Sequence, residues 1–364
     1  MGDIGNKKDR YIYLDILRIL ATIGVVVGHL SAQYWESIEI GGYSWNVFTL
    51  YGGIIRWCVP DFMMISGALI LSRDIPISKI YKKYCLRMVV TYFTWSLLYY
   101  IFADLANSPI QQVKNLLSLN AEGFVNILFA GFFHMWFIPM ITGMYMCVPL
   151  LRQIVKEKSY ARYFIILSLV FVFIIPQIDA WMNDFEMVTI RNYFNIFNRY
   201  VGSLQLNTIM GCAGYFIIGW YLNKYECKKM QRILIYILGI LGAGITLLCT
   251  YYSSVKYGIS SQTYYATLRL NLLMMAVAMF VLVKNIDWSF LEKFTPFISK
   301  LSKWSFGVYL VHLIVIGTLY KLGIDTLMFN PLYCVPVMTV VVTVFSFAIS
   351  ALLNKIPIVN KYIV

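Results

Sequence analysis

The sequence is poor in charge. Only 13% of its 364 residues are Asp, Glu, Lys or Arg, whereas 60% are apolar. A soluble domain carries about a quarter charged residues, so this chain lacks the polar surface that a water-soluble fold requires. The deficit excludes a soluble globular protein and indicates that lipid forms part of the solvent.

Cysteine is sparse, and no cysteine motif is present. The seven cysteines stand singly, mostly in or near apolar stretches, without a CxxC or zinc-ligand spacing. We interpret them as packing residues and expect no metal site. The net charge of +13 would suggest nucleic acid in a soluble protein, but the cations gather in short clusters between apolar runs. Orientation in a membrane explains such clusters, so we expect no nucleic-acid partner.

Long apolar runs recur along the whole chain, each able to cross a hydrocarbon core of about 30 Å as a helix. We predict an all-α, polytopic transmembrane helical bundle that forms a single integral membrane domain over residues 1–364. The apolar segment 123–133 is too short to span and is expected to lie in the membrane interface or to enter it partway. The ten predicted spans are 14–33, 51–72, 85–104, 136–153, 163–180, 205–223, 232–251, 267–284, 304–321 and 333–353.

The distribution of Lys and Arg predicts the orientation. If the spans alternate, the side that holds the N-terminus collects 22 of the 30 cations and the opposite side six, while Arg18 and Arg56 lie in or at the edge of spans. Because cytoplasmic loops are enriched in Lys and Arg, both termini are predicted to be cytoplasmic. The polar segment Met1–Arg10 precedes a charged apolar stretch without a small-residue cleavage site, which indicates a retained helix.

Three polar side chains share one face of the first predicted span. Arg18 and His29 are eleven positions apart, which at about 100° per residue places them about 20° apart around the helix and about 16 Å apart along it. Asp15 lies one turn before Arg18 and can pair with it. An anchoring ion pair and a packed histidine are the structural alternatives. We predict catalytic roles for His29, Arg18 and Asp15.

The second predicted span contains Asp61 and Ser66. A carboxylate among apolar residues needs a partner, and Arg56 is the nearby candidate. Ser66 and Gly67 would let another helix approach closely, with a hydrogen bond across the interface, and this packing role is the simpler interpretation for Ser66.

The other two histidines of the chain also lie in or beside spans. Histidine at membrane depth normally faces the bundle interior. His134 and Trp136 are placed at the outer mouth of the fourth span, where Trp136 could instead be an interfacial anchor. Tyr309 and His312, one turn apart, are consistent with a buried hydrogen-bonded pair.

A basic stretch follows the second span and contains Lys82, Lys83 and Arg87. Such a cluster usually sets orientation or contacts anionic lipid heads. The functional alternative is a phosphate-binding patch for a nucleotide-containing donor.

Four segments together resemble the acyltransferase-3 family of integral membrane O-acyltransferases. They are the Asp-x-x-Arg opening with ten residues between Arg18 and His29, the Val59-Pro60 to Ser66-Gly67 stretch, His134-x-Trp136-Phe137, and Ser305–His312. They occur in the family's order across a similar ten-helix arrangement. The chain departs from the family at Lys82 and Lys83, where arginines are common, and at Asp61, where the family more often has an apolar residue.

The resemblance implies transfer of an acyl group, most often acetyl from acetyl-CoA, to a hydroxyl of a cell-surface glycan or lipid-linked sugar outside the bacterial cytoplasmic membrane. It implies that Arg18 and His29 are needed for activity and that the donor is bound near Lys82, Lys83 and Arg87. We assign substrate contacts to the remaining candidates, which are His134, Trp136, Ser66, Asp61, Tyr309 and His312.

Two other functions remain open at this point. Membrane domains attached to some serine racemases of glycopeptide resistance resemble the same family and are thought to move amino acids, so a solute carrier is the alternative. Because no racemase domain follows before Val364, the enzyme is the preferred hypothesis. The third possibility is an inactive partner subunit in polysaccharide export.

Overall fold

The computed structural model describes residues 11–102, 108–186 and 188–364, and in this part of the chain it contains helices and no strands. The basic residues Lys7, Lys8 and Arg10, counted above toward the cytoplasmic side, lie outside the described residues. The helices are α1 (Ile12–Ala32), α2 (Tyr43–Ile54), α3 (Cys58–Ile70), α4 (Ile77–Lys79), η2 (Ile80–Cys85), α5 (Leu86–Phe102), α6 (Pro109–Leu117), α7 (Ala121–Ala130), η3 (Phe133–Trp136), α8 (Phe137–Lys156), α9 (Lys158–Ser168), η4 (Leu169–Ile174), α10 (Ile175–Asp184), α11 (Val188–Ser203), α12 (Leu206–Lys224), α13 (Lys229–Tyr257), η5 (Thr263–Tyr265), α14 (Leu270–Asn285), η6 (Ser289–Phe294), α15 (Thr295–Lys321), α16 (Pro331–Leu353) and α17 (Pro357–Tyr362).

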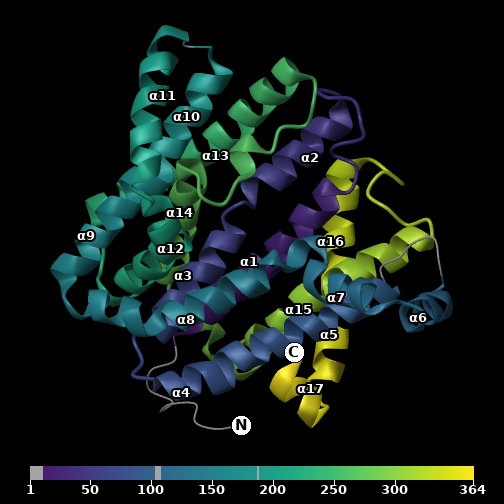
Figure 1. The fold of residues 1–364 in the computed structure, drawn as a ribbon. Coiled ribbons are helices and arrows are strands. Elements are labelled where there is room, and N and C mark those ends of the chain that lie inside the picture. Colours follow the sequence, from purple (N-terminus) through teal and green to yellow (C-terminus); the bar gives the residue numbers. More distant parts are fainter. Residues whose placement is uncertain (1–10, 103–107, 187) are drawn as a thin grey trace.

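The predicted membrane architecture is confirmed. Among the described residues, nine helical segments are long and apolar enough to cross a membrane, and each overlaps one of the ten predicted spans. The remaining predicted span, 205–223, forms α12, which has 19 residues and a kink at Gly211. Figure 1 shows these helices as one bundle, so the chain is a polytopic helical membrane protein.

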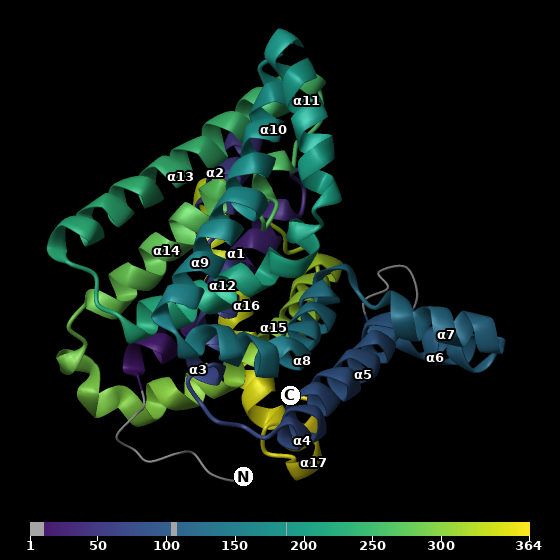
Figure 2. The same ribbon diagram turned by 60° about the vertical axis from the view of Figure 1, so that its left-hand side comes forward.

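The short apolar segment predicted at 123–133 forms the ten-residue helix α7. Helices α6 and α7 make a hairpin that projects from one side of the bundle beyond the end of α5 (Figure 2). Both helices begin at a capped end, because Ser108 accepts a hydrogen bond from the Gln111 amide and Asn120 accepts one from the Gly123 amide. The hairpin is therefore a defined element and does not cross the bundle.

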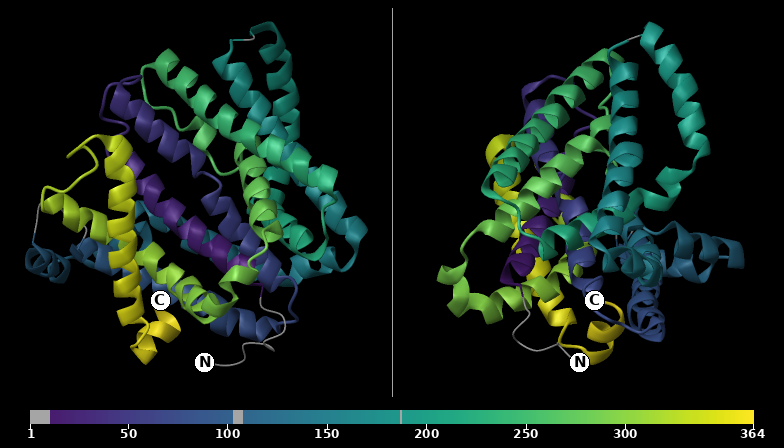
Figure 3. Two further views of the ribbon diagram at one scale, coloured as in Figure 1. Left: turned by 180° about the vertical axis from the view of Figure 1, so that it is seen from behind. Right: turned by 90° about the vertical axis from the view of Figure 1, so that its left-hand side faces the viewer.

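Helix α1 lies at the centre of the bundle, packed against α2, α3, α15 and α16 (Figure 3). The closest crossing is between α3 and α12. A Cβ atom added to Gly67 would lie 2.1 Å from the main-chain oxygen of Phe216, and one added to Gly219 would lie 2.1 Å from that of Met64. Reciprocal glycines thus let the two backbones touch, as small residues do in membrane helix pairs.

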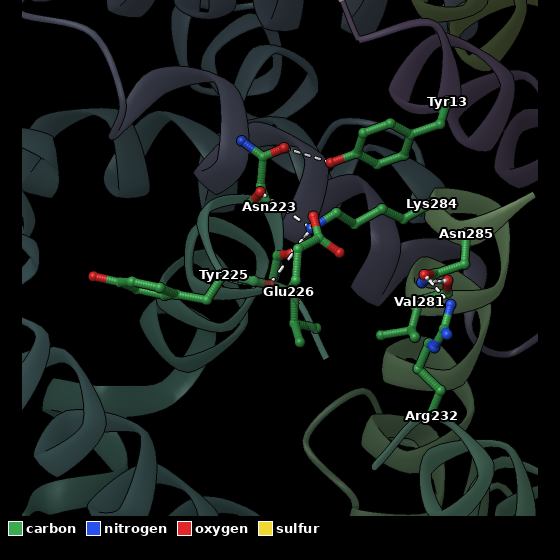
Figure 4. Close-up of polar contacts among 9 residues, drawn as sticks. Tyr13, Asn223, Tyr225, Glu226, Arg232, Val281, Lys284 and Asn285 are labelled. Carbon is green, nitrogen blue, oxygen red and sulfur yellow. Dashed lines mark hydrogen bonds and ion pairs between the residues drawn. The ribbon is translucent and has the colours of Figure 1, made fainter. Parts of the chain in front are cut away.

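A polar network closes the end of the bundle where α1 begins (Figure 4). The Lys284 ammonium donates to the carbonyls of Leu222 and Asn223, at 2.7 and 3.2 Å, and forms an ion pair with Glu226 at 2.9 Å. The Tyr13 hydroxyl donates to the Asn223 side chain. A cation at the last carbonyls of α12 stabilises that helix end. The network brings the start of α1 and the ends of α12 and α14 together, and Arg232 at the start of α13 donates to the Asn285 side chain at 2.7 Å. The alternating topology predicts that these helix ends lie on one side.

Candidate active site

All three histidines of the chain meet inside the bundle. His29 comes from α1, His134 from the short helix η3, and His312 from α15. Their ring centroids are separated by 5.0 Å between His29 and His312, 5.5 Å between His134 and His312, and 6.2 Å between His29 and His134. Residues 283 positions apart in the sequence are thus neighbours, and we call these three residues the histidine cluster.

Aromatic side chains fix the position of His134. The Tyr309 hydroxyl donates to the His134 carbonyl at 2.8 Å, which ties η3 to α15. Tyr99 of α5 stacks on Phe132 at 4.6 Å and donates from its hydroxyl to the Leu310 carbonyl at 2.7 Å. Because His134 also packs edge-on against Tyr99 at 4.9 Å, three elements hold its ring in place.

The hydrogen bonds of His312 define its tautomer. Its Nδ1 atom lies 2.8 Å from the Tyr309 carbonyl oxygen and 3.2 Å from that of Val308. Carbonyl oxygens only accept hydrogen bonds, so Nδ1 carries a proton. In the neutral ring, Nε2 then has a free lone pair and can accept a proton.

Three ring nitrogens of the cluster lack a hydrogen-bond partner among the described residues. Both nitrogens of His134 and Nε2 of His312 are buried without a well-formed hydrogen bond to the described residues. Buried polar atoms are nearly always paired, so each exception needs an explanation, and a catalytic role is one of those known. Across the described part of the chain, no group of three or more His, Cys, Asp or Glu side chains is arranged to hold a metal ion.

Asp15 and Arg18, the charged residues on this face of α1, face the same helix as His29. The Ser299 hydroxyl of α15 donates to Asp15 at 3.5 Å, and Arg18 donates to the Ser302 hydroxyl at 3.4 Å. Ser302 precedes His312 by ten residues, or about 15 Å along α15. The predicted common face of Asp15, Arg18 and His29 is therefore the side of α1 that packs on α15, with Asp15 and Arg18 well separated from the histidine cluster.

Two cavities lie against aromatic neighbours of the cluster, on the side away from Arg18. One of about 340 Å³ is lined by the ends of α1 and α15 together with Phe132 and Phe133. The other, of about 310 Å³, lies between α5 and the α6–α7 hairpin and is also lined by Phe132. Phe133 contacts the His29 ring, with centroids 5.6 Å apart. Aromatic walls thus lead from the first cavity to the cluster.

The predicted pair of Asp61 and Arg56 was wrong. Asp61 is fully buried, and neither carboxylate oxygen has a hydrogen-bond partner among the described residues. Arg56 instead lies over the Tyr265 ring, with its guanidinium carbon 3.8 Å from the centroid. The cause is a turn at residues 55–57, which interrupts the helix between the two side chains.

Ser66 lies in the helix contact as the packing interpretation expects, but without the suggested hydrogen bond across the interface. Its hydroxyl donates to the Phe62 carbonyl of its own helix at 2.8 Å, and it has no bond to another helix in the described part of the chain. On α3 the close approach of α12 is provided by Gly67, opposite Gly219 of α12. This arrangement agrees with the packing interpretation of the Ser66-Gly67 pair.

Trp136 and Tyr309 occupy different surroundings. Trp136 is 46% exposed and packs edge-on against Phe137, as an interfacial anchor would. The predicted bond between Tyr309 and His312 exists, but it uses the Tyr309 main-chain oxygen, because the phenol is already bonded to His134. Tyr309 therefore belongs to the frame of the cluster.

The predicted donor-binding residues are not equivalent. Lys82 and Lys83 are exposed on the π-helix η2. Arg87 is partly buried, lies 5.7 Å from the Phe306 ring centroid and donates to the Val364 carbonyl. Arg87 and Arg18 both lie within electrostatic range of Tyr145. Arg87 thus shares its surroundings with Arg18, whereas the two lysines remain at the surface.

Sequence reasoning missed two features beside the cluster. One is Tyr99, which packs against His134 and bonds to α15, and the other is the position of Arg56. Arg56 was placed near the start of a span at 51–72, but the helical segment begins at Tyr43 and Arg56 lies at its middle. Polar residues between 43 and 50 lower the hydropathy and hid the first half of that span. A useful signal was available, because Gly52-Gly53 before Arg56 and Pro60 after it predict a broken helix.

Comparison with known proteins identified one family. A family model described as an acyltransferase domain, the acyltransferase-3 type, matches residues 11–354. No curated protein and no solved structure matched the chain. The match covers the histidine cluster, the charged end of α1 and every segment that carried the resemblance.

Proposed function

Because the chain belongs to the acyltransferase-3 family and is a membrane acyltransferase, we propose that it O-acylates a glycan outside the bacterial cytoplasmic membrane. We propose acetyl as the acyl group and an acyl-CoA thioester as its donor. The acceptor is a hydroxyl of a cell-surface glycan or lipid-linked sugar. The observation that carries the proposal is the convergence of His29, His134 and His312 from three separate elements.

The cluster has the chemistry that acyl transfer requires. Imidazole accepts and returns a proton near neutral pH and can activate a hydroxyl as a general base. The Nε2 atom of His312 has its lone pair free in the neutral ring, and His29 lies next to it. We assign proton transfer from the acceptor hydroxyl to these two residues. His134 completes the pocket, and Tyr309 and Tyr99 position it.

The residues near Arg18 suit the polar half of a CoA thioester. CoA carries phosphates, which bind guanidinium and ammonium groups. Arg18 and Arg87 lie near one another around Tyr145, and Lys82 and Lys83 are exposed on η2. In our proposal these cations hold the donor from the cytoplasmic side. Asp15 orients Arg18, since both residues are anchored to serines of α15.

The aromatic cavity suits the acceptor. Its walls include Tyr34, Phe132, Phe133 and Tyr320, and its polar lining includes Gln33. Sugar rings present an apolar C–H face that packs on aromatic rings, with hydroxyl groups at the edge. Because Phe133 touches both this cavity and His29, a hydroxyl of a bound sugar would lie close to the cluster.

Purified protein tests the proposal. With acetyl-CoA and the glycan acceptor, the wild type should transfer the acetyl group, and His29→Ala should lower the rate by about 10²-fold or more, since a general base contributes that much. The exposed Lys229→Met variant is the matched control and should keep the wild-type rate. Full transfer by His29→Ala, at the same folded yield, would contradict the proposal.

A solute carrier is the second candidate, and Asp61 is the observation that favours it. Ionisable residues without a partner inside a membrane often mark ion or proton pathways. Reconstitution into proteoliposomes separates the two functions. Solute uptake without an acceptor, lost in Asp61→Asn and retained in His29→Ala, would favour the carrier.

A further inference from the structure

The second membrane-crossing segment is a broken helix with an arginine at the break. Helices α2 and α3 together cover Tyr43–Ile70, and residues 55–57 form a turn between them. Arg56 lies thirteen residues from the start of this segment and fourteen from its end. At membrane depth an interrupted helix is tolerated where it lines a cavity or is covered by protein. A cation at such a position needs a function.

The break packs directly against the part of α1 that carries His29. A Cβ atom on Gly24 would lie 2.2 Å from the Cys58 sulfur, and one on Gly28 would lie 3.0 Å from Cδ1 of Ile55. Gly28 is adjacent to His29 in the chain. Arg56 lies within electrostatic range of His29 as a result. Glycines at both positions are what allow the break to approach the histidine cluster.

The planar guanidinium group of Arg56 is held by stacking on its face, and the N–H groups at its edge have no protein acceptor among the described residues. The guanidinium lies over the Tyr265 ring at 3.8 Å, and that ring is itself fixed by stacking on Trp35 at 5.3 Å and by a hydrogen bond to the Thr49 carbonyl at 3.2 Å. Among the described residues, the Arg56 guanidinium makes no hydrogen bond or ion pair, and its Nε is buried. Stacking leaves the N–H donors of an arginine available for an anion.

We propose that Arg56 is a catalytic residue that stabilises the oxyanion formed at the acyl carbonyl during transfer. The inference rests on the proposed acyl-transfer function. The acceptor oxygen attacks the thioester carbon and a C–O bond forms, while the hydroxyl proton passes to a ring nitrogen of the cluster. The carbonyl oxygen becomes negative and accepts hydrogen bonds from Arg56. When the C–S bond breaks, the carbonyl reforms and the departing thiolate takes the proton.

The position of Arg56 distinguishes this role from binding of the CoA phosphates. The turn that carries it packs beside His29, near the end of α1, whereas Arg18 lies near the start of α1 and Arg87 shares its surroundings. The charge that develops beside the histidine cluster is that of the reacting carbonyl. A fixed donor in a site with little water stabilises such a charge strongly.

Steady-state kinetics of Arg56→Met and Arg56→Lys test the proposal, with Lys229→Met as a control that also removes one cation. Loss of an oxyanion donor lowers kcat by about 10²–10³-fold. We expect this loss in Arg56→Met with the KM for the donor unchanged within about threefold. Arg56→Lys should recover only a small part, because an ammonium lacks the planar fork. Added guanidinium ion should partly restore Arg56→Met.

Two other kinetic results would overturn the oxyanion role of Arg56. An unchanged kcat in folded Arg56→Met, or a defect only in the donor KM, would overturn the oxyanion role. A defect seen with succinyl-CoA and not with acetyl-CoA would show that Arg56 binds a carboxylate of the acyl group, and would also overturn it. If Arg56→Met does not fold, Arg56→Lys with the same readouts decides. A wild type without transfer defeats the proposed function itself, whereas activity in Arg56→Met and loss in His29→Ala defeats this inference alone.

Discussion

At the level of single residues, the proposed proton transfer depends on how the His312 imidazole is bonded. His312 donates from Nδ1 to main-chain carbonyls of its own helix, so its Nε2 is the nitrogen directed to chemistry. Sequence reasoning identified His312, His134 and His29 as unusual, because histidine is rare at membrane depth. It could not show that they meet, since that depends on the packing of α1, η3 and α15. Their mutual distances are a property of the fold.

The His312→Asn variant distinguishes the structural role of Nδ1 from the chemical role of Nε2. The asparagine amide can replace the Nδ1–H bond to the Val308 and Tyr309 carbonyls, but it leaves nothing at the position of Nε2. We expect a rate at least about 10²-fold below wild type, with an unfolding midpoint close to that of the wild type. Acetyl-transfer kinetics and thermal unfolding in detergent measure the two quantities. A variant that is active and equally stable would remove His312 from the mechanism.

At the element scale, the crossing of α3 and α12 holds the broken helix in place. Gly67 and Gly219 each leave no room for a methyl group, because main-chain atoms of the other helix lie 2.1 Å from the Cβ position. The sequence predicted the small-residue contact at Ser66-Gly67. It did not predict the break at residues 55–57, because a hydropathy window averages over both halves of the segment. This unpredicted break is also the reason why Arg56 is not the partner of Asp61.

Gly67→Ala should therefore destabilise the protein by about 1–3 kcal/mol, the usual cost of overpacking. Gly244→Ala in α13 is the matched control, because a Cβ atom there meets no atom within 4 Å. The control should be neutral or gain up to about 1 kcal/mol from helix propensity. Unfolding in detergent, followed by tryptophan fluorescence, measures both. Equal stability of the two variants would mean that the α3–α12 crossing is looser than described.

For the whole molecule, the sequence predicted the arrangement of the helices more completely than it predicted the contacts of the site residues. The apolar runs predicted α12 and the nine helical segments of the described residues that could cross a membrane. They could do so because a membrane span must be long and apolar, whichever helices it packs against. The polar network of Lys284, Glu226, Asn223 and Tyr13 joins helix ends that the Lys and Arg distribution placed on one side. That this side is cytoplasmic stays a prediction, as does the treatment of residues 1–364 as one domain.

Cysteine labelling of intact cells tests the orientation. In a background in which the exposed Cys147 is replaced by serine, a cysteine at Phe329, which is 69% exposed between α15 and α16, should react with an impermeant maleimide. A cysteine at Lys229 should react only after the cells are permeabilised. The positive-inside distribution of charge is the physical reason. The opposite pattern would invert the topology and the assigned sides of donor and acceptor.

The central claim is that the histidine cluster transfers an acyl group to a surface glycan. Mass spectrometry of glycans from cells that lack the protein, complemented with either wild type or His29→Ala, tests it most directly. We expect glycans with an added acyl mass, about 42 Da for acetyl or about 100 Da for succinyl, only with the wild type, while both proteins are present in the membrane at equal amounts. The same acyl mass increment in cells that carry His29→Ala would contradict it.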